Sequence, residues 1–134
     1  MPILWRRLMR NLTSVLAAAL VASTATTAYA HPKLLSASPA ANATVAAPKA
    51  VQLRFSEKLV ARFSTADLVM TGMPGMADHP PMKMSGVKTS VAGDGQTLVL
   101  SSARPLAAGT YRVDYRVVSS DTHPIKGSYS FRVK

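Results

Sequence analysis

The sequence predicts an all-β fold, a Greek-key β-sandwich of about seven short antiparallel strands. Short stretches in which apolar and polar residues alternate recur along the chain, a pattern typical of strands with one buried face. Turn-forming residues, among them 9 prolines and 7 glycines, separate these stretches. No stretch has convincing helical periodicity. This pattern favours a sandwich of immunoglobulin-like or Greek-key type.

The first thirty residues have the organisation of a secretory signal peptide. Three arginines, Arg6, Arg7 and Arg10, precede an apolar stretch at 12–22, and Ala28-Tyr29-Ala30 closes the segment as a small-residue cleavage signal. We therefore expect residues 1–30 to be removed and residues 31–134 to form one domain. A membrane anchor or a buried first helix is the alternative for this segment, and its residues do not decide between the Sec and twin-arginine export routes.

The strands follow in order along the remaining chain. Apolar residues occupy the odd positions of the stretch at 51–55, and the same alternation returns at 111–117 and at the end of the chain. Gly93-Asp94-Gly95 has the composition of a tight hairpin turn between two further strands. The predicted strands are 33–38, 51–55, 67–71, 87–92, 97–101, 111–117 and 129–133. The segment from Met70 to Gly86 departs from this pattern, and loops of such length are often functional.

Composition limits the chemistry available to the domain. The chain has 16 Lys and Arg against 6 Asp and Glu, a net charge of +10, and no cysteine. Disulfides and thiolate metal sites are therefore excluded. A basic surface suits nucleic acid, anionic lipid or an acidic protein. We expect no nucleic-acid partner for an exported protein, and because the cations are scattered we interpret them mainly as solvated surface.

Five methionines lie close together in the irregular segment, and no other part of the domain contains one. Thioether sulfur is a soft, neutral ligand that suits Cu(I) and needs no deprotonation. Interspersed glycines and prolines argue against the usual explanation, core packing on a helix. An adaptable partner-binding loop is the other alternative, and Met70, at the end of a strand, could belong to the core. The cluster comprises Met70, Met73, Met76, Met82 and Met84, with His79 among them.

A second set of donors suits Cu(II). Cleavage after Ala30 would give His31 a free amine beside its imidazole, two nitrogen donors on one residue. Asp121 and His123 are separated by one residue at the end of a predicted strand, so in extended geometry they point to the same face and can converge on one ion. The alternative makes Asp121 a turn-former and His123 a solvent-facing residue.

With these elements together, the chain resembles the CopC/PcoC family of periplasmic copper-resistance proteins over essentially all of the domain. The resemblance lies in several motifs: His31-Pro32-Lys33-Leu34, Phe55-Ser56-Glu57, Met70-Thr71-Gly72-Met73, Gly109-Thr110-Tyr111-Arg112-Val113 and Ser119-Ser120-Asp121-Thr122-His123-Pro124-Ile125. It implies a cupredoxin-like or immunoglobulin-like barrel or sandwich with Cu(I) and Cu(II) sites at opposite ends.

The resemblance also implies which residues form each site. The Cu(II) site falls on His31, Asp121 and His123, with Glu57 in a position sometimes assigned to it. The Cu(I) site falls on Met70, Met73, Met76, His79 and Met82, of which three or four bind at once. This chain has Ala77-Asp78 between Met76 and His79 where some members have one residue, which affects the register of His79.

These observations predict a periplasmic copper-binding protein that holds and transfers Cu(I) and Cu(II) in copper resistance or homeostasis, and not an enzyme. The alternative is a copper-dependent oxidative enzyme of the histidine-brace type, although the domain lacks the tryptophan expected of an aromatic substrate platform. A structural adhesion module would explain the strands but not the methionines. The resemblance suggests an inner-membrane copper transporter or a periplasmic multicopper oxidase as partner, and we expect a monomer.

Overall fold

The computed structural model describes residues 31–77 and 79–134. Within this part of the chain there are nine strands and one short 3₁₀ helix, η1. In chain order the elements are β1 (Leu34–Ser38), β2 (Thr44–Val45), β3 (Ala50–Phe55), η1 (Ala61–Phe63), β4 (Thr65–Gly72), β5 (Met82–Lys83), β6 (Val87–Val91), β7 (Thr97–Ser102), β8 (Gly109–Val118) and β9 (Pro124–Val133).

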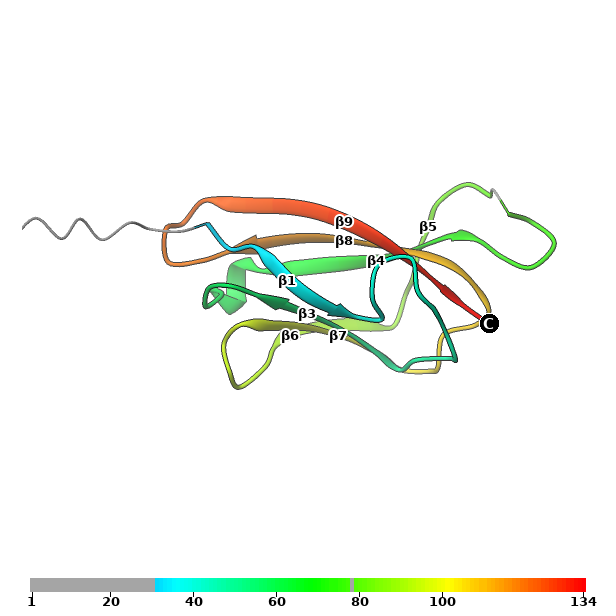
Figure 1. The fold of residues 1–134 in the computed structure, drawn as a ribbon, viewed down its shortest axis with the longest axis horizontal. Coiled ribbons are helices and arrows are strands. Elements are labelled where there is room, and N and C mark those ends of the chain that lie inside the picture. The colour runs from blue at the N-terminus through cyan, green and yellow to red at the C-terminus, as the bar shows by residue number, and fades with distance from the viewer. Residues whose placement is uncertain (1–30, 78) are drawn as a thin grey trace, which may run out of the picture.

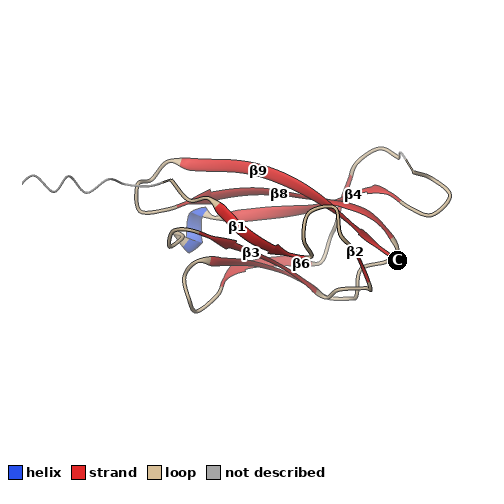
Figure 2. Cartoon of the chain, in the orientation of Figure 1, coloured by secondary structure: helices blue, strands red, loops and turns tan. Residues whose placement is uncertain are grey.

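The strands form two sheets that pack face to face (Figures 1 and 2). One sheet has the order β1-β3-β7-β6, and the other has the order β2-β9-β8-β4-β5. This confirms the predicted all-β sandwich, and each of the seven predicted strands is present. Two differences concern short elements: β2 and β5 have two residues each, too few to produce a periodic pattern, and β2 pairs with β9 in parallel, so the fold is not wholly antiparallel.

The core lies between the sheets, where the inward-facing positions of the strands meet. Apolar side chains on β3, β7, β8 and β9 are almost completely shielded from solvent, and aromatic rings fill much of the space. The ring of Tyr111 stacks on Phe131 with centroids 5.6 Å apart, and its hydroxyl donates a 2.7 Å hydrogen bond to the carbonyl of Ala107. Such a bond lets a buried tyrosine satisfy its polar group while fixing the turn that leads into β8.

The longest strands connect the two ends of the sandwich. β8 begins at Gly109, where an added Cβ would lie 2.6 Å from the carbonyl oxygen of Gly72, and it ends at Val118 beside the β8–β9 turn. Its 10 residues span roughly 30 Å at the usual rise of an antiparallel strand. Figure 1 shows the segment that leads into β1 and the β8–β9 turn at one end of the long axis and the loop between β4 and β5 at the other.

The predicted signal segment, residues 1–30, lies outside the described residues. In the part of the chain that is described, none of the helical structure is long and apolar enough to cross a membrane.

Candidate metal centre

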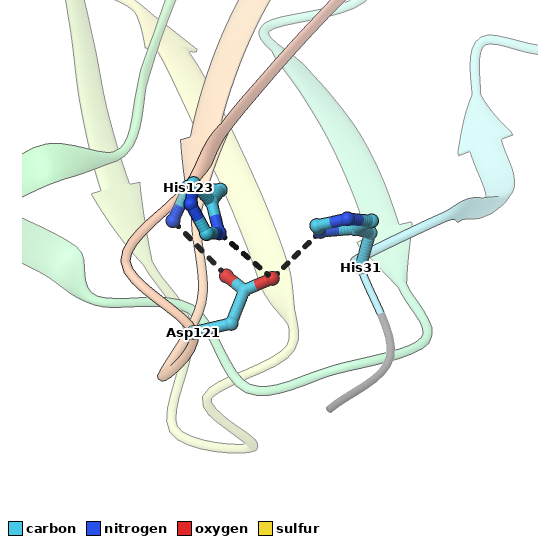
Figure 3. Close-up of side chains that lie close together, drawn as sticks. All are labelled: His31, Asp121 and His123. Atoms are coloured by element: carbon cyan, nitrogen blue, oxygen red, sulfur yellow. Dashed lines mark hydrogen bonds and ion pairs between the residues drawn. The ribbon is translucent and has the colours of Figure 1, made fainter. Parts of the chain in front are cut away.

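Three of the residues predicted to bind Cu(II) lie together at one end of the sandwich (Figure 3). His31 directly precedes β1, and Asp121 and His123 belong to the turn between β8 and β9. One ligand atom from each lies within 4.8 Å of the other two. His31 Nδ1 is 2.6 Å from Asp121 Oδ2, and His123 Nδ1 is 3.9 Å from the same oxygen. The carboxylate thus lies between two imidazoles that come from distant parts of the chain.

The local backbone brings Asp121 and His123 together in a way that the sequence did not predict. We expected extended geometry across residues 121–123, but the strand pairing ends at Val118 and Pro124 and the residues between them form a turn. Thr122 has φ 66, and its N–H donates to the carbonyl of Ser119 at 3.0 Å. A left-handed conformation is uncommon for a β-branched residue. The convergence of the two side chains therefore depends on this turn and not on strand alternation.

Asp121 is held as a buried, ionised carboxylate. Only 7% of its side chain is exposed. Desolvation by burial would raise its pKa, but hydrogen bonds from the Ser119 hydroxyl, the His123 backbone N–H and His31 outweigh burial and hold the pKa of Asp121 below its ordinary value. Oδ1 accepts from Ser119 Oγ at 3.0 Å and from the His123 N–H at 3.2 Å. Oδ2 lies 2.6 Å from His31 Nδ1 and has no other hydrogen-bond partner among the described residues, so it keeps a lone pair for a further partner.

This donor set fits a copper(II) ion. Two imidazole nitrogens and one carboxylate oxygen are the nitrogen and oxygen ligands that Cu(II) prefers in tetragonal geometry. The side chains of His31 and His123 are 59% and 74% exposed, so an ion can reach their nitrogens from solvent. Glu57, the fourth predicted residue, is half-buried just after β3 and is not part of the group. Among the described residues Glu57 also forms no ion pair.

At the opposite end, two of the predicted methionines face each other across a tight turn. Met73 and Met76 exchange two backbone hydrogen bonds of 2.9 Å, and Pro74 and Gly75 form the corner between them. Gly75 has φ 81, the positive value that a type II turn requires after proline. Directly opposed residues project to the same face with Cβ atoms about 4.5–5.5 Å apart. Both thioethers are solvent-accessible, at 39% and 53% exposure, so this turn presents a pair of soft ligands.

His79 offers a ring nitrogen in the same loop. Its Nδ1 lies 2.7 Å from the carbonyl oxygen of Pro80. A carbonyl oxygen only accepts, so Nδ1 donates this hydrogen bond, and in the neutral imidazole Nε2 is then the nitrogen that can bind a metal ion. Nε2 is shielded from solvent and has no hydrogen-bond partner among the described residues. A histidine whose second nitrogen is oriented by a carbonyl is the usual arrangement of a metal ligand.

The remaining methionines have different environments. Met70 points into the core with 5% exposure, and its methyl group lies 3.1 Å from where a Cβ on Gly109 would be. The structure therefore does not bring Met70 to the exposed thioethers and favours its alternative role in the core. Met82 pairs with Met70 in the sheet register but is 50% exposed at the edge, on β5. Met84 packs against the core.

Two residues at these sites were not singled out from the sequence. Ser119 is 2% exposed and donates to Asp121, and Gly72 lies so close to the loop that an added Cβ would be 2.4 Å from the carbonyl oxygen of Ala77. Ser119 lies in a motif that supported the family resemblance, but its hydrogen bond depends on the turn. The role of Gly72 depends on contact with a residue five positions later that no periodic pattern reveals.

Comparison with known proteins shows that the chain is similar to copper-resistance proteins. Residues 34–134 match the family model described as CopC domain. The chain is 50% identical over 121 residues to Copper resistance protein C of Escherichia coli, covering 90% of this chain and 95% of that protein. The match to Copper resistance protein C of Xanthomonas campestris pv. juglandis is 52% over 122 residues, covering 91% and 93%. The crystal structure of PcoC, a methionine-rich copper resistance protein from Escherichia coli, superposes with a TM-score of 0.72 at 51% identity, covering 78% of this chain and 100% of that one.

Proposed function

The chain belongs to the CopC family, and from that premise we propose that it is a periplasmic protein that binds copper in both oxidation states and passes it on in copper resistance or homeostasis. Cu(II) is held by His31, Asp121 and His123. Cu(I) is held by the exposed methionines and His79. The protein acts as a carrier, and copper is its cargo.

The observation that carries the proposal is the buried Asp121 carboxylate between two accessible imidazoles. Apart from the His31 imidazole, Oδ2 of this buried carboxylate has no hydrogen-bond partner among the described residues, and a cation beside a buried ionised oxygen stabilises it. A copper(II) ion would satisfy that oxygen and both ring nitrogens together. Cleavage after Ala30 would add the amine of His31 as a further nitrogen donor. Glu57 would join only if the segment after β3 moved toward the cluster.

The Cu(I) site is proposed on Met73 and Met76, with His79 and Met82 as further donors. The two opposed thioethers provide soft ligands that remain available at any pH. The free Nε2 of His79 provides a borderline ligand in the same loop. Met70 could contribute only by leaving the core, so it is the least suited of the predicted set.

These sites are better suited to binding and transferring copper than to oxidative catalysis. A histidine-brace enzyme needs a flat, often aromatic surface beside its copper to hold a polymer substrate. Here Phe55, Tyr111 and Phe131 are fully buried, and among the described residues Phe63 is the one aromatic side chain that is exposed. A soft-ligand site at the other end would also serve no purpose in such an enzyme. An inner-membrane copper transporter or a periplasmic multicopper oxidase would be a suitable donor or acceptor.

Metal titration of protein purified with His31 as its first residue tests the proposal. We expect separate loading with Cu(II) and Cu(I), one ion of each. Asp121→Asn should weaken Cu(II) binding and leave Cu(I) binding unchanged, whereas Met73→Leu with Met76→Leu should do the reverse. A methionine placed before His31 should weaken Cu(II) alone. Equal losses for both ions in every variant would contradict separate sites, and absence of copper binding would contradict the function.

A further inference from the structure

An exposed aromatic side chain lies at the same end of the sandwich as the histidine cluster. Phe63 is the last residue of η1 and is 50% exposed. Figure 2 shows this helix beside the strand ends near the β8–β9 turn. Exposure of a large ring to water forgoes the stabilisation that burial would give, and aromatic residues are enriched at the centres of protein interfaces. The exposure of the Phe63 ring therefore calls for a functional explanation.

The position of Phe63 is fixed by the strand that leads to the metal cluster. The Val60 N–H donates to the Val118 carbonyl at 2.7 Å, and the buried Ser64 hydroxyl bonds to both the N–H and the carbonyl of Val118, at 3.1 and 3.3 Å. Leu59 forms a bridge with Ser119, whose hydroxyl holds Asp121. The ring is thus displayed by a turn anchored on both sides, a few residues from the proposed Cu(II) ligands.

Three cations lie near this turn, and two of them contact Phe63 directly. Arg62 lies over its face, with Cζ 4.7 Å from the ring centroid. Arg116 Nη1 is 3.4 Å from the carbonyl oxygen of Phe63, and Lys126 is directly opposite Arg116 in the β8–β9 register. Like charges opposite each other in a sheet are destabilising. Among the described residues no carboxylate lies within ion-pair distance of these three cations.

The carboxylates on the same sheet face are already paired. Asp67 bonds to Lys83 at 2.9 Å, and Asp114 forms a bidentate pair with Arg112 at 2.8 and 2.9 Å. Arg116 and Lys126 line the same shallow hollow as these two carboxylates, but among the described residues neither cation lies within ion-pair distance of them. The fold therefore leaves a group of cations around Phe63 without internal neutralisation.

We propose that Phe63, Arg62, Arg116 and Lys126 form a docking surface for a protein partner that has an apolar recess bordered by carboxylates. This proposal rests on the proposed function, because copper leaves a site by ligand exchange and the acceptor must come close to His31 and His123. Phe63 with Arg62 over its face, and with further cations nearby, matches the residue types that are enriched in interface hot spots. Carboxylates on the partner would relieve the repulsion between Arg116 and Lys126 and steer the encounter.

A protein fits this surface better than an anionic membrane does. Surface helices that insert into lipid display several apolar side chains along one face. Here η1 has 3 residues and displays one aromatic ring, part of which is covered by Arg62. Asp67 and Asp114 on the same face are already paired with Lys83 and Arg112, so these ion pairs add no net charge that would attract a uniformly negative lipid surface. A partner with carboxylates at defined positions avoids them.

A peptide probe tests the proposal without a known partner. The probe is a blocked peptide with glutamates on both sides of a central leucine, and its counterpart has glutamine in place of every glutamate. Titrated into the ¹⁵N-labelled protein at low salt, the acidic probe should shift amide signals of residues 61–64, 116 and 126, and the neutral probe should not. Phe63→Ser, and separately Arg116→Gln with Lys126→Gln, should lower the association constant about tenfold, as removal of an interface anchor does.

Matched variants separate docking from nonspecific charge attraction. Arg54→Gln with Lys88→Gln removes the same charge from the outer face of the other sheet and should leave probe binding almost unchanged, and Phe63→Leu should retain most of it. Equal losses in both double variants, shifts spread over the whole surface, or no binding by the wild-type protein would overturn the proposal. Binding to phosphatidylserine-containing vesicles that is lost in Phe63→Ser, without binding to the peptide, would overturn it in favour of a membrane.

Copper titrations of the same variants keep this proposal distinct from the proposed function. We expect Phe63→Ser and the Arg116 and Lys126 variants to bind Cu(II) as the wild-type protein does, because none of these residues belongs to the cluster. If the wild-type protein binds the acidic probe but no copper, the proposed function fails while the docking surface stands. If it binds copper normally but not the probe, only the docking surface fails.

Discussion

Ser119→Ala provides a sharp test of how the Cu(II) site is organised, because it removes a supporting hydrogen bond and no ligand. Ser119 is 2% exposed, and its hydroxyl donates to Asp121 Oδ1 at 3.0 Å. The same oxygen also accepts the His123 N–H at 3.2 Å, so one restraint remains after the substitution. Loss of a hydrogen bond that orients a metal ligand costs about 10–100-fold in affinity. With one restraint left, we expect a loss near the lower limit, about tenfold.

The assay is competition for Cu(II) against a chelator of known affinity, with each protein purified to begin at His31. Cu(I) is titrated in parallel, and we expect no change because Ser119 lies at the opposite end from the methionine turn. Ser64→Ala is the matched control, since it also removes a buried serine hydroxyl at this end. The Ser64 hydroxyl bonds only to the backbone of Val118 and not to Asp121. Both variants should lose similar stability, and only Ser119→Ala should lose Cu(II) affinity.

Two results would refute this reasoning. If Ser119→Ala binds Cu(II) as tightly as the wild-type protein, the orientation of Asp121 does not depend on that hydroxyl. If Ser64→Ala loses as much affinity as Ser119→Ala, the effect comes from loosening the end of β8 and not from the carboxylate.

Three further predictions address the other end of the molecule and its stability. Gly72→Ala would place a Cβ 2.4 Å from the carbonyl oxygen of Ala77, so the methionine turn must move. Cu(I) affinity should therefore fall while Cu(II) affinity stays the same. Parallel titrations in which the variant binds Cu(I) as tightly as the wild-type protein would contradict this. Tyr111→Phe removes a 2.7 Å hydrogen bond to a main-chain carbonyl and should lower the free energy of unfolding in urea by about 1 kcal/mol without affecting either ion; an unchanged midpoint would contradict it. Hydrogen bonds, first of all from the backbone N–H of Gln96, lower the pKa of Asp94, so its contribution to stability should be lost as pH falls through that pKa. In Asp94→Asn thermal stability should fall less steeply with acid, and an identical slope would exclude this role.

The architecture could be predicted because the strands of a sandwich have an alternating pattern of apolar and polar residues in the sequence. Residues that alternate along β3 and β8 do so because one sheet face is buried and the other meets water. β9 starts at Pro124, earlier than the predicted 129, because Pro124 and Gly127 interrupt the apolar pattern although the backbone still pairs with β8. The glycine has a physical reason: the Tyr115 ring occupies the space where a Cβ would be.

The residues of the candidate sites could be predicted from the sequence, but their arrangement in space could be predicted less well. Residue type alone indicates which ions could bind, since imidazole, carboxylate and thioether differ in softness. The positions depend on turns that the sequence pattern does not specify. The left-handed Thr122 brings Asp121 and His123 together, and the Pro74–Gly75 corner opposes two methionines. The location of Met70 in the core could be foreseen only as an alternative, because a methionine at the end of a strand can either pack in the core or bind a metal ion.

The separation of the two ends restricts how copper can move. β8 alone spans roughly 30 Å, so an ion released from the methionine turn cannot reach the histidine cluster of the same molecule without passing through solvent. The donor sets also differ in softness, so a copper ion that changes its oxidation state at one end binds more weakly to the donors there. The donors that suit its new oxidation state lie at the other end of the molecule. Under the proposed function, each oxidation state therefore needs its own route in and out, through contacts at its own end. Two proposed sites at opposite ends of one sandwich would let the protein present copper to two different partners at once. The exposed, anchored Phe63 beside the histidine end is where we expect one of these contacts to form.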